Sequence, residues 1–91
     1  MEWRASHILV KNQKLAYEVL KRVKKGGNFS ALAKEFSTCP SKAKGGDLGW
    51  FGPGKMVKEF ENAVTKTSSG IIGRVIRTQF GFHIIKKTGQ R

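Results

Sequence analysis

The sequence is poor in cysteine, in long apolar runs and in acidic residues. Its single cysteine, Cys39, cannot form a disulfide within the chain, which excludes a disulfide-stapled scaffold. No apolar run approaches the roughly 20 residues that a membrane-spanning helix needs. The first residues also lack the charged and apolar regions of a signal peptide. We therefore expect a cytoplasmic protein, with the inner membrane surface as a peripheral site.

The shortage of acidic residues leaves a strongly basic chain. Six Asp and Glu stand against 18 Lys and Arg, for a net charge of +12 over 91 residues. Such a charge attracts nucleic acid and anionic lipid headgroups, and it also keeps copies of a protein apart, which favours a monomer. One segment is especially basic, and it is either a second binding face for anionic membrane or nucleic acid, or a solvated helix face. Its cations are Lys14, Lys21, Arg22, Lys24 and Lys25.

The length allows one domain, 1–91, with one modest core. Apolar spacing and strand-forming residues predict a strand over 3–10, helices over 14–25, 29–36 and 56–64, and strands over 73–78 and 81–87. Asn12 and Asn28 can cap the first two helices, and Pro40 can open a single helical turn. This order of elements is typical of an α+β fold, with helices packed on a small, mainly antiparallel sheet.

A glycine-rich and apolar segment follows the second predicted helix. Between Gly45 and Gly54, five glycines surround three large apolar residues, one of which is Leu48. A loop of this composition folds back on a core or lines a pocket. Met56 and Phe60 follow it at i and i+4 of the third predicted helix. With Leu48 they form either part of the core or an apolar cup that a proline ring would fill.

Few side chains are candidates for chemistry. His7 lies on the first predicted strand and His83 on the last, so the two rings could meet, or each could be a hydrogen-bonded core histidine. Together with Cys39 they could form a zinc site, but their spacing lacks the compactness of a metal motif. A Cys-His protease would need an oxyanion hole, and Pro40 removes the backbone N–H that follows the thiol. Cys39 could equally be buried and inert.

Five short segments, in order and at compatible spacing, resemble the parvulin family of peptidyl-prolyl cis/trans isomerases over the whole chain. They are Ser6-His7-Ile8-Leu9-Val10, Phe36-Ser37-Thr38-Cys39-Pro40-Ser41, Gly45-Gly46-Asp47-Leu48-Gly49, Gly54-Lys55-Met56 and Gly81-Phe82-His83-Ile84-Ile85. The resemblance implies a four-stranded, mainly antiparallel sheet surrounded by four helices. It also implies rotation of X-Pro imide bonds in proline-containing protein substrates, with no cofactor and no metal.

The same resemblance implies a role for each matching residue. The implied catalytic residues are His7, Cys39, Thr78 and His83, and the implied substrate-binding residues are Leu48, Met56, Phe60 and Phe80. His7 and His83 match the family's paired histidines, with Thr78 hydrogen-bonded in their network, and we expect Cys39 to share it. Members of the family carry Cys or Asp at the position of Cys39, which indicates an electrostatic role and a non-covalent mechanism. Phe80 falls in the loop that closes over the site.

One departure from the family pattern bears on the substrate. Phosphate-directed parvulins carry a long loop after the first strand, with an arginine pair that grips phosphoserine or phosphothreonine. Here the segment 11–14 leads straight into the predicted helix and holds no arginine, so the bidentate guanidinium fork is absent. We therefore expect a non-phosphospecific enzyme. Lys11, Lys42 and Lys44 are expected to favour acidic residues before proline by a modest, salt-sensitive margin.

Two other classes of protein stay open. Phe80-Gly81-Phe82 is similar to the aromatic strand of RNA-recognition motifs, where bases stack on exposed rings. That signature belongs to an inner strand, however, and Thr78 and Gln79 replace the basic residue and the glycine that open it. A non-catalytic chaperone or membrane-surface adaptor would keep the fold and the charge without needing a histidine pair.

Overall fold

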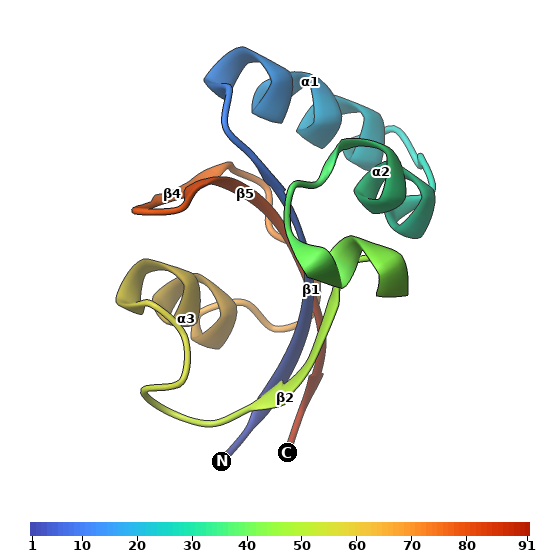
Figure 1. The fold of residues 1–91 in the computed structure, drawn as a ribbon. Helices are drawn as coiled ribbons and strands as arrows, with labels where there is room; N and C mark the ends of the chain where they lie inside the picture. The colour runs from blue at the N-terminus through green and yellow to red at the C-terminus, as the bar shows by residue number, and fades with distance from the viewer.

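The computed structural model describes residues 1–91, the whole of the printed sequence. Its elements, in chain order, are β1 (Trp3–Val10), α1 (Gln13–Lys24), α2 (Phe29–Phe36), the 3-10 helix η1 (Pro40–Lys44), β2 (Asp47–Phe51), α3 (Lys58–Thr65), β3 (Gly70–Ile71), β4 (Ile76–Thr78) and β5 (Gly81–Gln90). Every strand pair is antiparallel. The predicted α+β class is therefore confirmed (Figure 1).

The first and last strands, β1 and β5, lie side by side at the centre of the sheet (Figure 1). β2 forms one edge next to β1, whereas β3 and β4 both pair with β5 on its other side. The central pair runs in register from Trp3 opposite Gln90 to Val10 opposite Phe82, with one irregularity after Arg4. This pairing brings the two ends of the chain together, and it places His7 and His83 on adjacent strands, as predicted.

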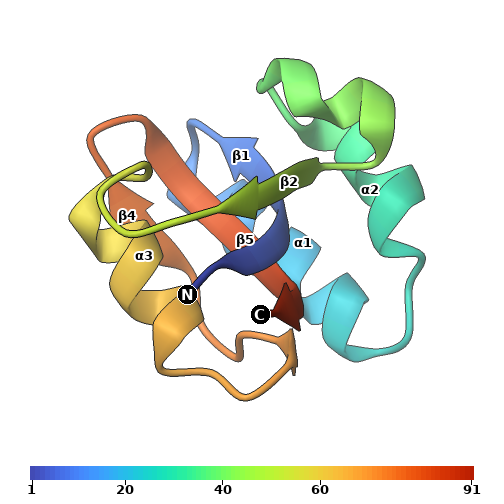
Figure 2. The ribbon, with the colours of Figure 1, turned by 90° about the horizontal axis from the view of Figure 1, so that it is seen from below.

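The sheet separates two apolar clusters, because side chains alternate between the two faces of a strand. On one face Ile8 and Ile84, both fully buried, pack with the apolar residues of α1 and α2. On the other face Ile85 and Ala5 pack with Phe60 and its neighbours in α3. Figure 2 shows α3 on one side of the central strands and α1 with α2 on the other. One face of the sheet thus carries only a single helix, which leaves room for a pocket beside it.

The first two helices form where apolar spacing predicted them. The residues that α1 buries, Ala16, Val19, Leu20 and Val23, follow the helical period. Asn12 caps α1 by accepting a hydrogen bond from Leu15 N–H at 3.0 Å, and Asn28 caps α2 by accepting one from Ala31 N–H at 2.9 Å. Both predicted caps are therefore confirmed.

Several details differ from the sequence-based expectation. The sheet has five strands where four were implied, because Gly70 and Ile71 form a short strand that pairs with β5. Three α-helices and the short η1 take the place of the expected four helices. The third helix begins at Lys58, because Val57 keeps an extended backbone at its N-cap, so Met56 precedes the helix and does not share a helix face with Phe60.

The strand expected over 73–78 is shorter in the structure. Regular pairing begins only at Ile76, after a bend at Gly73 and Arg74. The structure contains no helix long and apolar enough to span a bilayer.

Candidate active site

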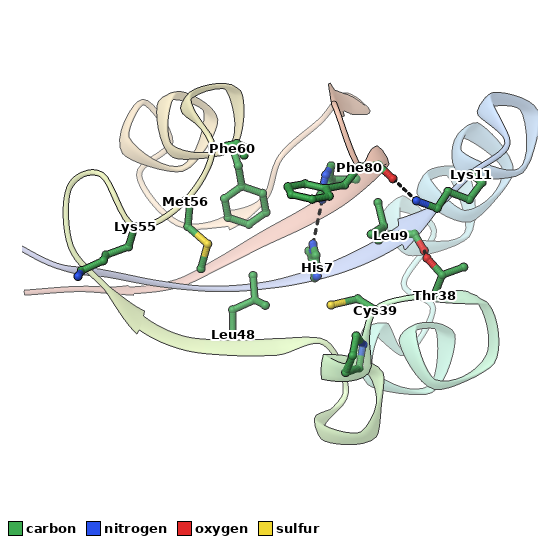
Figure 3. Close-up of a pocket in the computed structure, with 13 residues that line it drawn as sticks. His7, Leu9, Lys11, Thr38, Cys39, Leu48, Lys55, Met56, Phe60 and Phe80 are labelled. Carbon is green, nitrogen blue, oxygen red and sulfur yellow. Dashed lines mark hydrogen bonds between the residues drawn. The ribbon is translucent and has the colours of Figure 1, made fainter.

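A pocket of about 550 Å³ opens on the face of the sheet that carries α3 (Figure 3). Its lining residues are His7, Leu9, Lys11, Thr38, Cys39, Pro40, Leu48, Lys55, Met56, Val57, Phe60, Phe80 and His83. Of the eight predicted site residues only Thr78 is missing from this lining, and it contacts His83 instead. We call His7, Phe60, Thr78 and His83 the pocket floor, and Lys11, Cys39, Lys55 and Phe80 the pocket rim.

The floor is built around the predicted histidine pair. In the register of β1 and β5, His7 lies opposite Ile85 and Leu9 lies opposite His83, so the two histidines are diagonal neighbours on one face. Their rings stack with centroids 5.1 Å apart, and their Nδ1 atoms are 2.9 Å apart, within hydrogen-bonding distance. Both rings pack edge-to-face with Phe60. The centroid of the Phe60 ring is 5.7 Å from that of His7 and 5.5 Å from that of His83.

Thr78 extends the hydrogen-bond chain of the histidine pair. Its hydroxyl lies 2.7 Å from Nε2 of His83 and accepts the backbone N–H of Phe80 at 3.1 Å. The chain therefore runs from the rim loop that carries Phe80, through Thr78, to both histidines. The predicted place of Thr78 in this network agrees with the geometry.

Burial keeps both histidines neutral at pH 7. Burial, and after it the neighbouring His83, lower the pKa of His7 from 6.5 to about 4. Burial, and after it the ammonium of Lys11, lower the pKa of His83 from 6.5 to about 4. A positive charge on either ring would therefore have to form in an apolar floor beside a second ring or a cation.

The hydrogen-bond partners favour one tautomer of each histidine. The contact between the two Nδ1 atoms needs one hydrogen. If His83 donates it, His83 Nε2 accepts the hydroxyl hydrogen of Thr78, and His7 keeps its own hydrogen on Nε2. In the opposite arrangement the Thr78 hydroxyl hydrogen has no partner in the structure. The favoured arrangement leaves His7 Nε2–H buried without a hydrogen-bond partner.

Gly46 fixes the backbone beneath His7. The N–H of His7 donates to the carbonyl of Gly46 at 2.9 Å, and Gly46 has a φ of +90°, a conformation that favours glycine. A Cβ on Gly46 would lie only 2.4 Å from the carbonyl oxygen of His7. This close approach explains why the glycine-rich segment belongs to the site.

Cys39 reaches the pocket from a loop that is tied to β1. Ser37 Oγ accepts the N–H of Leu9 at 3.0 Å, and Thr38 N–H donates to the carbonyl of Leu9 at 2.8 Å. The half-buried Cys39 then points its sulfur into the pocket (Figure 3). No hydrogen bond joins the thiol to the histidines, so the expected shared network is not formed. The anchored loop holds Cys39 at the side of the pocket, whereas the histidines lie on its floor.

The apolar side of the pocket is the predicted cup. Leu48 comes from β2, Met56 from the turn before α3 and Phe60 from α3 itself, and Val57 adds a fourth apolar side chain that the sequence analysis missed. Figure 3 shows the side chains of Leu48 and Met56 pointing toward the same space beside Phe60. Two segments, β2 and the stretch from Met56 to Phe60, thus converge on one apolar cup.

The rim carries two cations and no carboxylate. Lys11 donates from Nζ to the backbone carbonyl of Phe80, and Lys55 lines the opposite end of the pocket (Figure 3). Lys55 directly precedes Met56 in the sequence. Only the turn before α3, however, places Lys55 at the pocket. Lys42 and Lys44, which were expected to flank the site, do not line the pocket. The chain also brings no three His, Cys, Asp or Glu side chains into an arrangement that could hold a metal ion.

A cup beside a neutral histidine pair, on this fold, defines a class of protein. Residues 2–91 match the family model of the PPIC-type PPIASE domain. The chain therefore belongs to the PPIC-type, or parvulin, family and is a peptidyl-prolyl cis/trans isomerase domain, as the sequence motifs indicated.

Particular relatives within this family are foldases. The chain is 58% identical to foldase protein PrsA of Geobacillus kaustophilus over 86 residues, which are 93% of this chain and 31% of that protein. The crystal structure of PrsA from Bacillus subtilis, at 52% identity, superposes with a TM-score of 0.92 and covers 99% of this chain and 36% of that one. The chain thus spans about a third of the length of the curated relatives it matches.

A shorter relative matches almost from end to end. The solution structure of NmPin, the parvulin of Nitrosopumilus maritimus, superposes with a TM-score of 0.80 at 42% identity. It covers 97% of this chain and 96% of that one. The fold described here is therefore also the fold of a parvulin of about the same length.

Proposed function

We propose that the pocket is the active site of this isomerase domain, and that it rotates X-Pro bonds without a covalent intermediate. One observation carries the proposal: an apolar cup opens directly beside a buried, neutral histidine pair and a thiol. In this proposal Leu48, Met56 and Phe60 hold the proline ring. The carbonyl that precedes proline swings past Cys39 during rotation. Residues 1–91 act as one domain.

The physical basis is the resonance of the imide bond. Rotation is slow because conjugation gives the C–N bond partial double-bond character, with a barrier of about 18–20 kcal/mol. The planar form carries partial negative charge on its carbonyl oxygen, and the twisted form loses it. A site that removes water, and that offers no positive charge to this oxygen, destabilises the planar form relative to the twisted one. Neutral rings on His7 and His83 meet this condition, whereas imidazolium rings would oppose it.

Cys39 has a non-covalent role in this mechanism. A carboxylate beside the carbonyl oxygen disfavours the charge-separated planar form, and so does a thiol whose sulfur lone pairs face that oxygen, so either group can serve. We expect Cys39→Asp to keep much of the wild-type kcat/KM in a proline-isomerisation assay. A nucleophilic thiol could not be replaced by a carboxylate at little loss. Abolished turnover in Cys39→Asp, with the fold intact by circular dichroism, would revive covalent catalysis.

We infer that the enzyme does not require a phosphorylated substrate. Only Lys11 and Asn12 separate β1 from α1, so there is no room for an arginine-bearing phosphate loop. The ammonium of Lys11 is also already bonded to Phe80. A panel of peptides with Ala, Glu or phosphoserine before proline tests this inference. Turnover of the phosphorylated peptide alone would overturn it.

A second candidate function is attachment to anionic surfaces through α1. The exposed cations of this surface are Lys14, Lys21, Arg22 and Lys24 on α1 and Lys25 at its C-cap, while the apolar stripe of the helix is buried. Figure 2 shows α1 on the side of the sheet away from α3, so this basic surface is separate from the pocket. Near an anionic membrane each cation contributes about 1 kcal/mol, and phosphates of nucleic acid would attract the same side chains.

The test of this second function is sedimentation with acidic and neutral lipid vesicles, alongside a duplex-DNA shift assay, at low and physiological salt. Salt-sensitive binding that Lys21→Gln with Lys25→Gln weakens would support it. No binding to vesicles or DNA at low salt leaves a solvated helix face.

Three expectations from the sequence stay predictions. The cytoplasmic location rests on the single free thiol, and fractionation of cells tests it. The monomeric state rests on the net charge, and sedimentation velocity tests it. Of the three cations on which the preference for acidic residues before proline rested, Lys11 lines the pocket, whereas Lys42 and Lys44 do not.

A further inference from the structure

The two cations of the pocket rim differ in what they are free to do. The ammonium of Lys11 is bonded to the carbonyl of Phe80, so it holds the rim loop in place. The ammonium of Lys55 makes no hydrogen bond and no ion pair in the structure, and its side chain is exposed. Only two ion pairs exist in the chain, Arg4 with Asp47 and Arg91 with Glu2, and neither involves the pocket lysines.

The acidic residues nearest in sequence to Lys55 do not neutralise it. Glu61 accepts the backbone N–H of Gly54 at 2.8 Å and so helps to fix the turn that carries Lys55. Glu59 lies exposed in the first turn of α3 without an ion pair. No carboxylate lines the pocket itself. An acidic side chain supplied by a ligand would therefore find an unpaired cation at this end.

The place of Lys55 relative to the cup indicates which residue of a substrate it meets. Figure 3 shows Lys55 and Lys11 at opposite ends of the pocket, with Met56 beside Lys55 and Cys39 closer to the other end. If the proline ring occupies the cup and the preceding carbonyl faces Cys39, the chain leaves the cup at the Lys55 end. This step rests on the proposed placement of the substrate in the pocket.

We propose that Lys55 is a specificity-determining residue, and that it favours substrates with aspartate or glutamate immediately after the proline. A solvent-exposed ion pair of this kind contributes little and is screened by salt. We therefore expect kcat/KM for a peptide with Ala-Pro-Glu to exceed that for Ala-Pro-Gln by about two- to fivefold at low salt. The ratio falls toward one at high ionic strength.

The experiment measures this ratio in four proteins. The wild type gives the reference value, Lys55→Gln brings the ratio close to one, and Lys55→Glu inverts it. Lys42→Gln removes an exposed cation outside the pocket and is the matched control, so its ratio stays that of the wild type. A second pair of peptides, Glu-Pro-Ala and Gln-Pro-Ala, measures the effect of an acidic residue before proline, which is smaller because Lys11 is occupied.

The outcomes separate this proposal from the function on which it rests. Turnover of every peptide, with a post-proline ratio near one or unchanged in Lys55→Gln, overturns the role of Lys55 and leaves the isomerase site intact. A larger effect before proline than after it also overturns this role, because it places the acidic residue at the Lys11 end. Failure to turn over any peptide overturns the proposed active site itself.

Discussion

The floor and the rim of the pocket are built by different means. The floor residues come from β1, α3, β4 and β5, and their exposed fractions are 5% for His7, 2% for Phe60, 7% for Thr78 and 3% for His83. The rim residues lie on turns and loops, and Phe80 is 49% exposed. The fold itself therefore fixes the floor, whereas individual contacts such as that between Lys11 and Phe80 fix the rim.

This difference separates two kinds of substitution. A change in the floor disturbs the core and the site together, because the same side chains serve both. A change in the rim alters the binding of substrate while the core stays packed. Stability and activity measured on matched pairs of variants can test this distinction.

The largest expected effect is that of Phe60→Ala compared with Met56→Ala. Phe60 is buried against both histidines, so its truncation lowers the free energy of unfolding by about 3–5 kcal/mol. Met56 is half-buried before α3, and its truncation costs less than about 2 kcal/mol while kcat/KM falls by about tenfold. Denaturant unfolding and the isomerisation assay measure the two quantities.

Since Phe60→Ala takes away a large share of the stability of a small domain, Phe60→Leu is the milder companion, with an expected loss of about 1–2 kcal/mol. A single unfolding transition in each variant would also support one domain. Equal loss of stability in Met56→Ala and Phe60→Ala would mean that the buried floor matters no more to the fold than the half-buried turn before α3.

The next effect concerns two glycines with similar backbones. Gly46 and Gly54 have φ values of +90° and +79°, so alanine at either position is strained by about 1–2 kcal/mol. A Cβ on Gly46 would also press on the carbonyl of His7, whereas one on Gly54 would meet nothing within 4 Å. We expect Gly46→Ala to lose about 3 kcal/mol or more, and Gly54→Ala about 1 kcal/mol. Similar losses in thermal unfolding would show that the contact with His7 can relax.

A third effect is the pH dependence of stability. Both histidines have a pKa near 6.5 when unfolded and about 4 in the folded protein. Between these values the unfolded state binds more protons, so stability is fully present above pH 6.5 and is lost as the pH falls toward 4. Unfolding midpoints between pH 5 and 7 measure the slope in a range where ordinary carboxylates stay charged.

His83→Phe should reduce this slope, because it removes one of the two buried imidazoles. The control is an exposed substitution such as Lys42→Gln, which leaves the slope unchanged. A flat profile in the wild type over this range would mean that the histidines are not held neutral by burial.

The sequence predicted the floor better than the rim, for a physical reason. Apolar spacing predicted the buried faces of α1 and α2, and the resemblance to the family placed His7, His83 and Thr78, because these residues lie on regular helices and strands. The bond of Lys11 to Phe80 joins residues 69 positions apart through one flexible side chain, and no local pattern encodes it. The thiol of Cys39 makes no hydrogen bond with the histidines, and this absence likewise depends on how the loop 37–39 is tied to β1.

The smallest expected effect is that of Lys11→Gln, at the place where the rim meets the floor. The contact of Lys11 with Phe80 fixes the rim loop, and Phe80 N–H donates in turn to Thr78, which is bonded to His83. We expect Lys11→Gln to change the free energy of unfolding by less than about 0.5 kcal/mol, since the residue is exposed. The loss of the ammonium should nevertheless raise the pKa of His83, because that charge now lowers it.

Titration of the imidazole signals by NMR measures this shift, and kcat/KM should fall by about two- to fourfold as the loop of Phe80 loosens. Lys11→Arg keeps the charge and is the control, so the pKa of His83 should stay near that of the wild type. An unchanged titration in Lys11→Gln would mean that the rim does not act on the floor through its charge. The two regions would then be coupled only by the backbone N–H of Phe80 and the hydroxyl of Thr78.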